Sequence, residues 1–229
     1  LTPEEISSFI DKKVLNYEDS ILLAYLKGML SGFSYEQSIK QVVIDEAQDY
    51  TTLQYIIISK IFKKASFTIL GDVNQNINPY YKHETLEDLM QIFPCSKYIE
   101  LQKTYRSSKE IIDYTNKILG LNHVTAIRRE NSKPVIYRSN ISNLKKTILD
   151  DLNVLSLEYL KMAIIAKDHY IATKLYNTIK NDINVSLIND NTKGINSDLV
   201  IIPAYLAKGL EFDCVIIYND PLSKYKRNE

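Results

Sequence analysis

Two short hydrophobic runs, each followed at once by acidic or turn residues, most strongly restrict what this chain can fold into. Gln41 to Ile44 stops at an Asp-Glu pair, and Phe67 to Leu70 stops at Gly71-Asp72. Buried parallel strands have this pattern when their carboxyl ends open onto a site. The intervening segment, Thr52 to Phe62, has the length and apolar content of a crossover helix. The sequence therefore predicts a right-handed strand–helix–strand unit and an α/β fold.

The same alternation of strands and helices continues and divides the chain into two units. Helices are predicted in the first forty residues, where apolar side chains recur at helical spacing, at Leu15, Leu22, Leu23, Leu26, Met29 and Leu30. Further strands are predicted at Tyr98–Leu101, Val135–Tyr137, Met162–Ala166, Leu199–Pro203 and Cys214–Tyr218, and further helices at Ser107–Leu119, Ser142–Leu152 and His169–Lys180. Between Gly120 and Pro134 the periodicity is lost, which predicts a linker at 120–134 between units at 1–119 and 135–229.

Composition limits the kinds of partner. Of 229 residues, 28 are Lys or Arg and 28 are Asp or Glu, so no overall field draws the chain to a polyanion or a membrane. The apolar runs are far shorter than the roughly 20 residues that span a bilayer, and Leu1 to Ile10 lacks the pattern of a signal peptide. We expect a cytoplasmic protein with no membrane partner. Cys95 and Cys214 are expected to be buried thiols that bind no metal.

The residues from Val42 to Asp49 read VVIDEAQD and place two acids side by side after a strand. Adjacent carboxylates there suit hydrated Mg²⁺, which needs one or two carboxylates besides waters and substrate phosphates. On this interpretation Asp45 holds the metal and Glu46 activates the attacking water. The alternative for the dipeptide alone is a solvated turn.

Three further strings carry residues suited to phosphate chemistry. Thr68–Ile77 reads TILGDVNQNI, Glu100–Glu110 reads ELQKTYRSSKE and Val200–Ile217 reads VIIPAYLAKGLEFDCVII. Singly, these strings also have ordinary explanations: Gly71-Asp72 is a common turn, and Arg106 can pair with Glu110 at a helix start. The planar fork of an arginine also suits the charge that develops on a phosphoryl group.

In this order the four strings resemble motifs II, III, IV and V of the UvrD/Rep-like branch of superfamily 1 DNA helicases. The resemblance implies two RecA-like units of the P-loop NTPase type with mainly parallel sheets, the first incomplete, and ATP and Mg²⁺ as cofactors. By resemblance, Asp45 holds Mg²⁺ and Glu46 is the catalytic base. The other residues implied in hydrolysis or nucleotide binding are Gln75 at the γ-phosphate, Arg106 as arginine finger, Gln48, Tyr105 against adenine, Lys208, Gly209, and Glu211 near the ribose.

The chain departs from this family in ways that affect the expected function. It contains no G-x-x-x-x-G-K-[ST] motif and stops before motif VI, so we expect a fragment of a longer motor that is inactive alone. Pro203 and Tyr205 stand where motif V begins with Thr and His, which resembles the HelD (helicase IV-like) group, whose Gram-positive members bind RNA polymerase. Tyr80 and Tyr205 are the expected nucleic-acid contacts.

The expected function is ATP-driven movement on single-stranded or duplex DNA. Two alternatives stay open. One is an ATPase that binds RNA polymerase and releases it, and the other is a non-catalytic binding module if the parent protein lacks a phosphate-binding loop.

Overall fold

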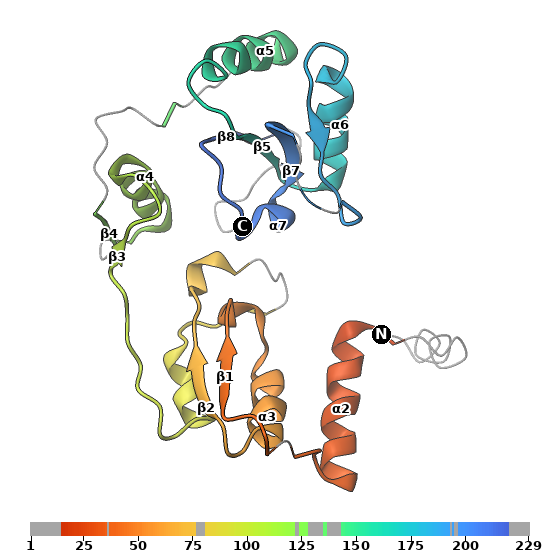
Figure 1. Ribbon diagram of the computed structural model, residues 1–229, viewed down its shortest axis with the longest axis vertical. Helices are drawn as coiled ribbons and strands as arrows, with labels where there is room; N and C mark the ends of the chain where they lie inside the picture. Colours follow the sequence, from red (N-terminus) through yellow and green to blue (C-terminus); the bar gives the residue numbers. More distant parts are fainter. Residues whose placement is uncertain are drawn as a thin grey trace. The chain divides into compact units, whose positions relative to one another are not determined.

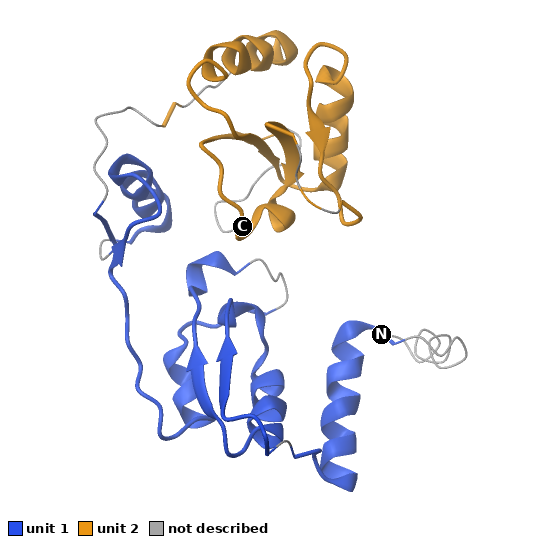
Figure 2. Cartoon of the chain, viewed as in Figure 1, with its two compact units in different colours: residues 1–131 blue, residues 132–229 orange. Residues whose placement is uncertain are grey.

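The computed structural model describes residues 15–35, 37–76, 81–121, 124–127, 135–136, 143–192, 194 and 197–219. The chain divides into two compact units, Leu1–Asn131 and Ser132–Glu229 (Figure 2). This boundary falls inside the interval 120–134. All strand pairs found in the described residues are parallel, so the expected α/β class with parallel sheets is confirmed.

The first unit is built on a strand–helix–strand motif (Figure 1). Its elements are α2 (Tyr17–Ser31), β1 (Gln41–Ile44), the 3₁₀ helix η1 (Ala47–Asp49), α3 (Thr52–Ile61), β2 (Ser66–Ile69), and the 3₁₀ helices η2 (Val73–Gln75) and η3 (Glu87–Gln91). Strands β1 and β2 pair in parallel from Gln41↔Ser66 to Ile44↔Ile69. The predicted unit is therefore confirmed, with each boundary within one residue.

The start of α3 is fixed by a capping box. The Thr51 hydroxyl accepts a hydrogen bond from the backbone N–H of Gln54, and the Gln54 side chain accepts one from the backbone N–H of Thr51. This pairing satisfies donors that the first helical turn leaves unpaired. The helix then buries Tyr55 against one face of the two strands, in a core formed by Ile44, Ala47, Tyr55, Leu89 and Phe93.

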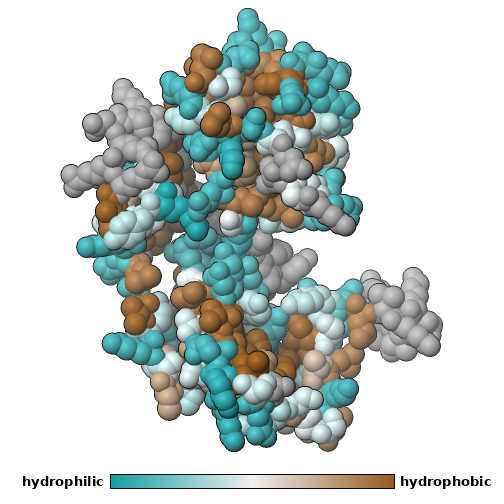
Figure 3. Space-filling view, viewed as in Figure 1, coloured by the Kyte–Doolittle hydropathy of each residue, from teal (hydrophilic) through white to brown (hydrophobic). Residues whose placement is uncertain are grey.

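Of the apolar stripe predicted before β1, five residues lie on α2 and Leu15 precedes that helix, and all six side chains are exposed. Helix α2 contacts α3, and its buried residue is Gly28. The exposed members are Leu15, Leu22, Leu23, Leu26, Met29 and Leu30. Apolar surface is visible on both units (Figure 3).

A small second motif completes the described part of the first unit. Strands β3 (Lys103–Thr104) and β4 (Thr125–Ala126) pair in parallel, with α4 (Lys109–Leu119) between them in sequence. The strand predicted at Tyr98–Leu101 is wrong, because pairing begins further along the chain, where the Thr125 N–H donates to the Gln102 carbonyl. Strand β4 also lies inside the segment predicted as linker.

The second unit is a four-stranded parallel sheet in the order β6-β7-β5-β8. Its elements are α5 (Leu144–Leu155), β5 (Met162–Ala166), α6 (His169–Ile179), β6 (Ser186–Leu187), β7 (Leu199–Pro203), α7 (Ala204–Ala207) and β8 (Cys214–Tyr218). Strands β5, β7 and β8 have the predicted bounds. The strand predicted at Val135–Tyr137 is wrong in its described part, because Val135 and Ile136 have no strand pairing there, and Tyr137 lies outside the described residues.

Both faces of this sheet are apolar, as expected of a parallel sheet with covered faces. Helices α5 and α6 pack on one face, in a core that includes Leu152, Ile164, Leu175 and Ile201. The other face is packed by Leu206 and Ala207 of α7 and by Phe212. The Asp168 carboxylate accepts a 2.8 Å hydrogen bond from the Ile171 N–H and so caps α6.

The two cysteines, both expected to be buried, differ in exposure. Cys95 is exposed, so its predicted burial is wrong, whereas Cys214 is half-buried, and burial followed by the charge of Asp213 raises the pKa of its thiol. Cys95 follows the apolar core residue Phe93 but belongs to no strand or helix.

Within the described residues, no helix has both the length and the apolar character needed to cross a membrane.

Candidate active site

The predicted acidic pair lies directly after β1. Asp45 is exposed, and its Oδ1 accepts a 2.8 Å hydrogen bond from the backbone N–H of Glu46. Glu46 has φ 51° and ψ 44°, the left-handed region, and among the described residues other than glycine it alone has a positive φ. A side chain in this region costs about 1–2 kcal/mol. The strand end is therefore bent sharply at the residue expected to act as base.

Gln48 joins the Glu46 side chain to the end of the neighbouring strand. Its side chain is fully buried. Its Nε2 donates a 2.6 Å hydrogen bond to Glu46 Oε2, and its Oε1 accepts a 2.9 Å bond from the backbone N–H of Asp72. Both ends of the Gln48 amide are thus used within the protein.

Asp72 carries the connection on to Gln75. Asp72 Oδ2 accepts a 2.9 Å hydrogen bond from Gln75 Nε2, and Asp72 Oδ1 accepts one from the Asn74 N–H and so caps η2. The carboxyl ends of parallel strands meet at one edge of a sheet, and here β1 and β2 bring Asp45, Glu46 and Gln75 to the same edge. Four of the sequence-predicted residues, Asp45, Glu46, Gln48 and Gln75, are therefore collected in one hydrogen-bonded site.

Three residues of this site had no role in the sequence interpretation. The sequence assigns Gly71 and Asp72 only to a turn. A Cβ added to Gly71 would lie 2.7 Å from Gln48 Oε1 and 2.9 Å from Ala47 Cβ, so the close approach of the two strand ends requires a glycine. The third is Tyr55, whose hydroxyl donates to the Ala47 carbonyl. A Gly-Asp turn after a strand was the available signal for the first two.

The remaining predicted residues lie on other elements. Tyr105 and Arg106 lie between β3 and α4, and both are exposed. Lys208 follows α7, and Gly209 has φ +78°, as expected of a tight turn. Glu211 is exposed in the loop before β8. Tyr80 lies outside the described residues.

Tyr205, on α7, donates its hydroxyl to Asp190 Oδ2 at 3.1 Å. Desolvation, followed by this bond and the carboxylate charge, raises the pKa of Tyr205. The phenol of Tyr205 therefore stays protonated at neutral pH, with its hydroxyl directed to an acid on the loop after β6.

The donor set suits a hydrated divalent cation. The described residues contain no group of three or more His, Cys, Asp or Glu that could enclose a metal. Mg²⁺ does not need such a cage, because it keeps several waters and binds one or two protein carboxylates together with substrate phosphates. Asp45 is exposed and next to a second carboxylate, so it fits this mode of binding.

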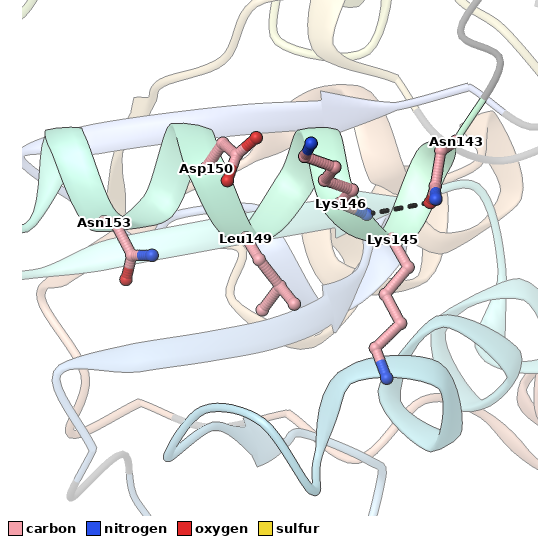
Figure 4. A pocket seen from close by; sticks show the side chains of 6 residues that line it. All are labelled: Asn143, Lys145, Lys146, Leu149, Asp150 and Asn153. Atoms are coloured by element: carbon pink, nitrogen blue, oxygen red, sulfur yellow. Dashed lines mark hydrogen bonds between the residues drawn. The ribbon is translucent and has the colours of Figure 1, made fainter.

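A pocket of about 350 Å³ lies elsewhere, on α5 of the second unit, and contains none of the predicted site residues. It is lined by polar side chains around Leu149, and the Lys146 N–H donates to Asn143 Oδ1 at its end (Figure 4). Lys145 there forms an ion pair with Asp182. These contacts account for a capped, solvated helix face.

The described contacts define a parallel α/β protein with an acidic site at the carboxyl edge of a sheet. Residues 12–87 match the UvrD/REP helicase N-terminal domain. The matched segment contains Asp45, Glu46, Gln48, Asp72 and Gln75, so the whole hydrogen-bonded site lies within it.

Curated relatives agree with this match. The ATP-dependent DNA helicase Rep of Escherichia coli is 32% identical over 115 residues, which make up 48% of this chain and 17% of Rep. The ATP-dependent DNA helicase srs2 of Schizosaccharomyces pombe is 25% identical over 130 residues, 56% of this chain and 14% of that helicase. The ATP-dependent DNA helicase UvrD2 of Mycobacterium tuberculosis is 27% identical over 89 residues, 38% of this chain and 13% of UvrD2.

The chain thus spans about a sixth of the length of Rep, at 17%. Over that part, it is related to the ATP-dependent DNA helicases of the UvrD/Rep family of superfamily 1, at their N-terminal domain.

Proposed function

We propose that this chain is part of a motor that couples ATP hydrolysis to movement on DNA. The observation that carries the proposal is the hydrogen-bonded set formed by Glu46, Gln48, Asp72 and Gln75 beside Asp45, inside the segment that matches the helicase domain. Acids at the carboxyl edge of a parallel sheet are placed as phosphoryl-transfer sites require.

In this proposal the residues of the first unit perform the chemistry. Asp45 holds Mg²⁺, which when bound neutralises charge on the phosphates. Glu46 accepts the proton of the attacking water. Gln75 contacts the γ-phosphate, and Arg106 stabilises the charge that develops on it. Tyr105 packs on adenine.

The second unit contributes contacts to the nucleotide from the segment between α7 and β8. Lys208, Gly209 and Glu211 lie there, with Glu211 near the ribose in this proposal. In this proposal both units are RecA-like, and the chain passes from one to the other within residues 120–134, beyond β4. The 229 residues contain no phosphate-binding loop of the G-x-x-x-x-G-K-[ST] type, so we propose that another part of the protein supplies it.

The base assignment is tested by Glu46→Gln in the full-length protein. Because the amide cannot accept the proton, we expect kcat for ATP hydrolysis to fall by roughly 10²-fold or more, with the Kd for ATP unchanged. Glu84→Gln is the matched control, since Glu84 is exposed in the same unit. Loss of ATP affinity with kcat retained would contradict the role of Glu46.

A second candidate function rests on Pro203 and Tyr205. Pro203 ends β7, and Tyr205 directs its hydroxyl to Asp190. These residues stand where helicases of the family carry Thr and His, as in the HelD-like group that acts on RNA polymerase. Stimulation of the ATPase by single-stranded DNA alone supports the DNA motor, and co-purification with RNA polymerase supports the second candidate. A full-length protein without a phosphate-binding loop would instead be a binding module.

A further inference from the structure

Three hydrogen bonds run in series from the proposed base to the proposed γ-phosphate sensor. Gln48 Nε2 donates to Glu46 Oε2 at 2.6 Å. The Asp72 N–H donates to Gln48 Oε1 at 2.9 Å, and Gln75 Nε2 donates to Asp72 Oδ2 at 2.9 Å. The series crosses from the end of β1 to the end of β2, with Gln48 in the middle.

Gln48 is held in one orientation by its surroundings. It is fully buried, and a buried amide is expensive to leave without hydrogen bonds. The backbone carbonyl of Gln48 accepts a 3.1 Å hydrogen bond from Asn76 Nδ2. Gly71 lies so close that a Cβ there would meet Gln48 Oε1 at 2.7 Å. Reversing the amide would place oxygen against the Glu46 carboxylate and N–H against the Asp72 N–H, so the orientation is unique.

Glu46 benefits from a fixed partner because its backbone is in the left-handed region. A carboxylate at the end of such a turn has several rotamers available, and a hydrogen bond to one oxygen selects among them. The donor is a neutral amide, so it orients the carboxylate without transferring a proton to it. The bond therefore leaves the base able to accept a proton.

We propose that Gln48 is a positioning residue that sets the direction of the Glu46 carboxylate and, through Asp72, fixes it relative to Gln75. This inference rests on the function proposed above. Base and sensor then act as one unit: a change in the position of Gln75 is transmitted to Glu46 through two hydrogen-bonded groups. Gln48 itself need not contact the nucleotide.

Two substitutions separate the two ends of the Gln48 amide. Gln48→Glu keeps an acceptor for the Asp72 N–H but loses the donor to Glu46 and opposes two carboxylates. Gln48→Met has similar length and loses both bonds. In the full-length protein we expect both to lower kcat for ATP hydrolysis by roughly 10–100-fold, by analogy with the loss seen when partners that orient metal-binding side chains are removed, with KM for ATP unchanged.

Gln54→Glu is the matched control. It makes the same change of charge in the same unit, and a glutamate at this position of a capping box keeps the bond to the Thr51 N–H. We expect wild-type kcat for it. Melting temperatures of all variants show whether a loss of kcat reflects unfolding, and a variant that has lost cooperative melting is not scored for kcat.

Hydrogen exchange at the Asp72 amide provides a readout that does not depend on turnover. In the nucleotide-free protein we expect faster exchange at Asp72 in Gln48→Met, because its acceptor is lost, and near wild-type exchange in Gln48→Glu. Equal protection of Asp72 in wild type and Gln48→Met would overturn the proposed link, whatever the ATPase activity.

A double-mutant cycle tests the coupling itself. If Gln48 and Gln75 act on Glu46 through one series, adding Gln75→Ala to Gln48→Met lowers kcat little beyond the more severe single variant. Effects that multiply would show independent action and overturn the inference.

Different results would overturn the positioning role of Gln48 and the proposed function. Wild-type kcat in a folded Gln48→Met protein, with turnover abolished by Glu46→Gln, overturns the positioning role and leaves the motor intact. Unchanged turnover in Glu46→Gln, or no ATPase activity in the unmodified full-length protein, overturns both.

Discussion

The hydroxyl of Tyr55, on α3, donates a 2.6 Å hydrogen bond to the backbone carbonyl of Ala47, and both residues are fully buried. The same carbonyl accepts a longer bond, 3.3 Å, from the Tyr50 N–H. Through this hydrogen bond, helix α3 stabilises η1, the 3₁₀ turn that follows the acidic pair. This contact connects the core of the first unit to the geometry of the candidate active site.

Tyr55→Phe removes this bond while keeping the ring. We expect the free energy of unfolding to fall by about 1 kcal/mol, the usual contribution of one hydrogen bond, because Ala47 O keeps its bond to Tyr50. Urea unfolding measures the change. Tyr17→Phe is the control: Tyr17 is 68% exposed, so we expect less than about 0.5 kcal/mol. Equal losses for the two variants would contradict a structural role of the buried hydroxyl.

The Tyr55 phenol also predicts a dependence of stability on pH. Burial, followed by the charges of Tyr50, Tyr81 and Asp49, raises the pKa of Tyr55 above its ordinary value of 10.0. The folded state then favours the neutral phenol, so its contribution is complete below pH 10 and is lost above it, where the unfolded chain ionises first.

The difference in unfolding free energy between wild type and Tyr55→Phe should therefore be constant from about pH 7 to 9 and shrink above about pH 10. The slope approaches about 1.4 kcal/mol per pH unit. Taking the difference removes the contribution of the other tyrosines. A difference that stays constant to about pH 11 would show that the phenol titrates normally in the folded protein.

Gly71→Ala should disturb the site through sterics alone. Gly71 does not have a positive φ, but a Cβ there would lie 2.7 Å from Gln48 Oε1 and 3.0 Å from the Ala47 backbone N. Such overpacking costs about 1–3 kcal/mol, and we expect it to displace Gln48 and lower ATP turnover. Gly32→Ala is the matched control. A Cβ at Gly32 would meet no atom within 4 Å, but φ there is +84°. We therefore expect this variant to lower the free energy of unfolding and to keep wild-type ATP turnover.

The sequence predicted the strand ends well because composition changes sharply there. Apolar β-branched runs stop at Asp45 and at Gly71-Asp72, and these boundaries held in the structure. The three longer strands of the second unit were equally clear. Strand pairing at Lys103–Thr104 was missed because a two-residue strand of polar side chains has no periodic signal.

The interior of the site could be predicted only in part. Asp45, Glu46 and Gln75 follow from recognisable strings. The orientation of Gln48 does not, because it depends on the Asp72 N–H, 24 residues further along the chain. The hydrogen bond between Tyr205 and Asp190 could not be predicted for the same reason, because 15 residues separate the two side chains and no local sequence pattern indicates their contact.

The sheet of the second unit offers a matched pair of isoleucines in neighbouring strands, one in the core and one exposed. Ile164 of β5 is fully buried, whereas Ile217 of β8 is 71% exposed. Ile164→Ala leaves a cavity and should lower the free energy of unfolding by about 2–5 kcal/mol. Ile217→Ala should change it by less than about 0.5 kcal/mol. Thermal or urea unfolding compares them, and similar losses would mean that β8 is covered in the complete protein.

Tyr205 allows a test of how this chain meets nucleic acid. If its ring stacks on a base, Tyr205→Ala should weaken binding of single-stranded DNA by about 1–3 kcal/mol, measured with the full-length protein. Tyr205→Phe keeps the ring and loses only the bond to Asp190, so its affinity should stay near wild type. Tyr170→Ala, at a 74% exposed tyrosine on α6 outside the motifs, is the control.

The salt dependence of the same binding separates stacking from charge. A tyrosine neutralises no phosphate, so Tyr205→Ala should lower affinity by the same factor at every salt concentration and leave the slope of log K against log salt unchanged. A changed slope would mean that the substitution moves basic residues away from the backbone. Unaltered DNA affinity, together with weaker capture of RNA polymerase, would instead assign Tyr205 to a protein interface and favour the second candidate function.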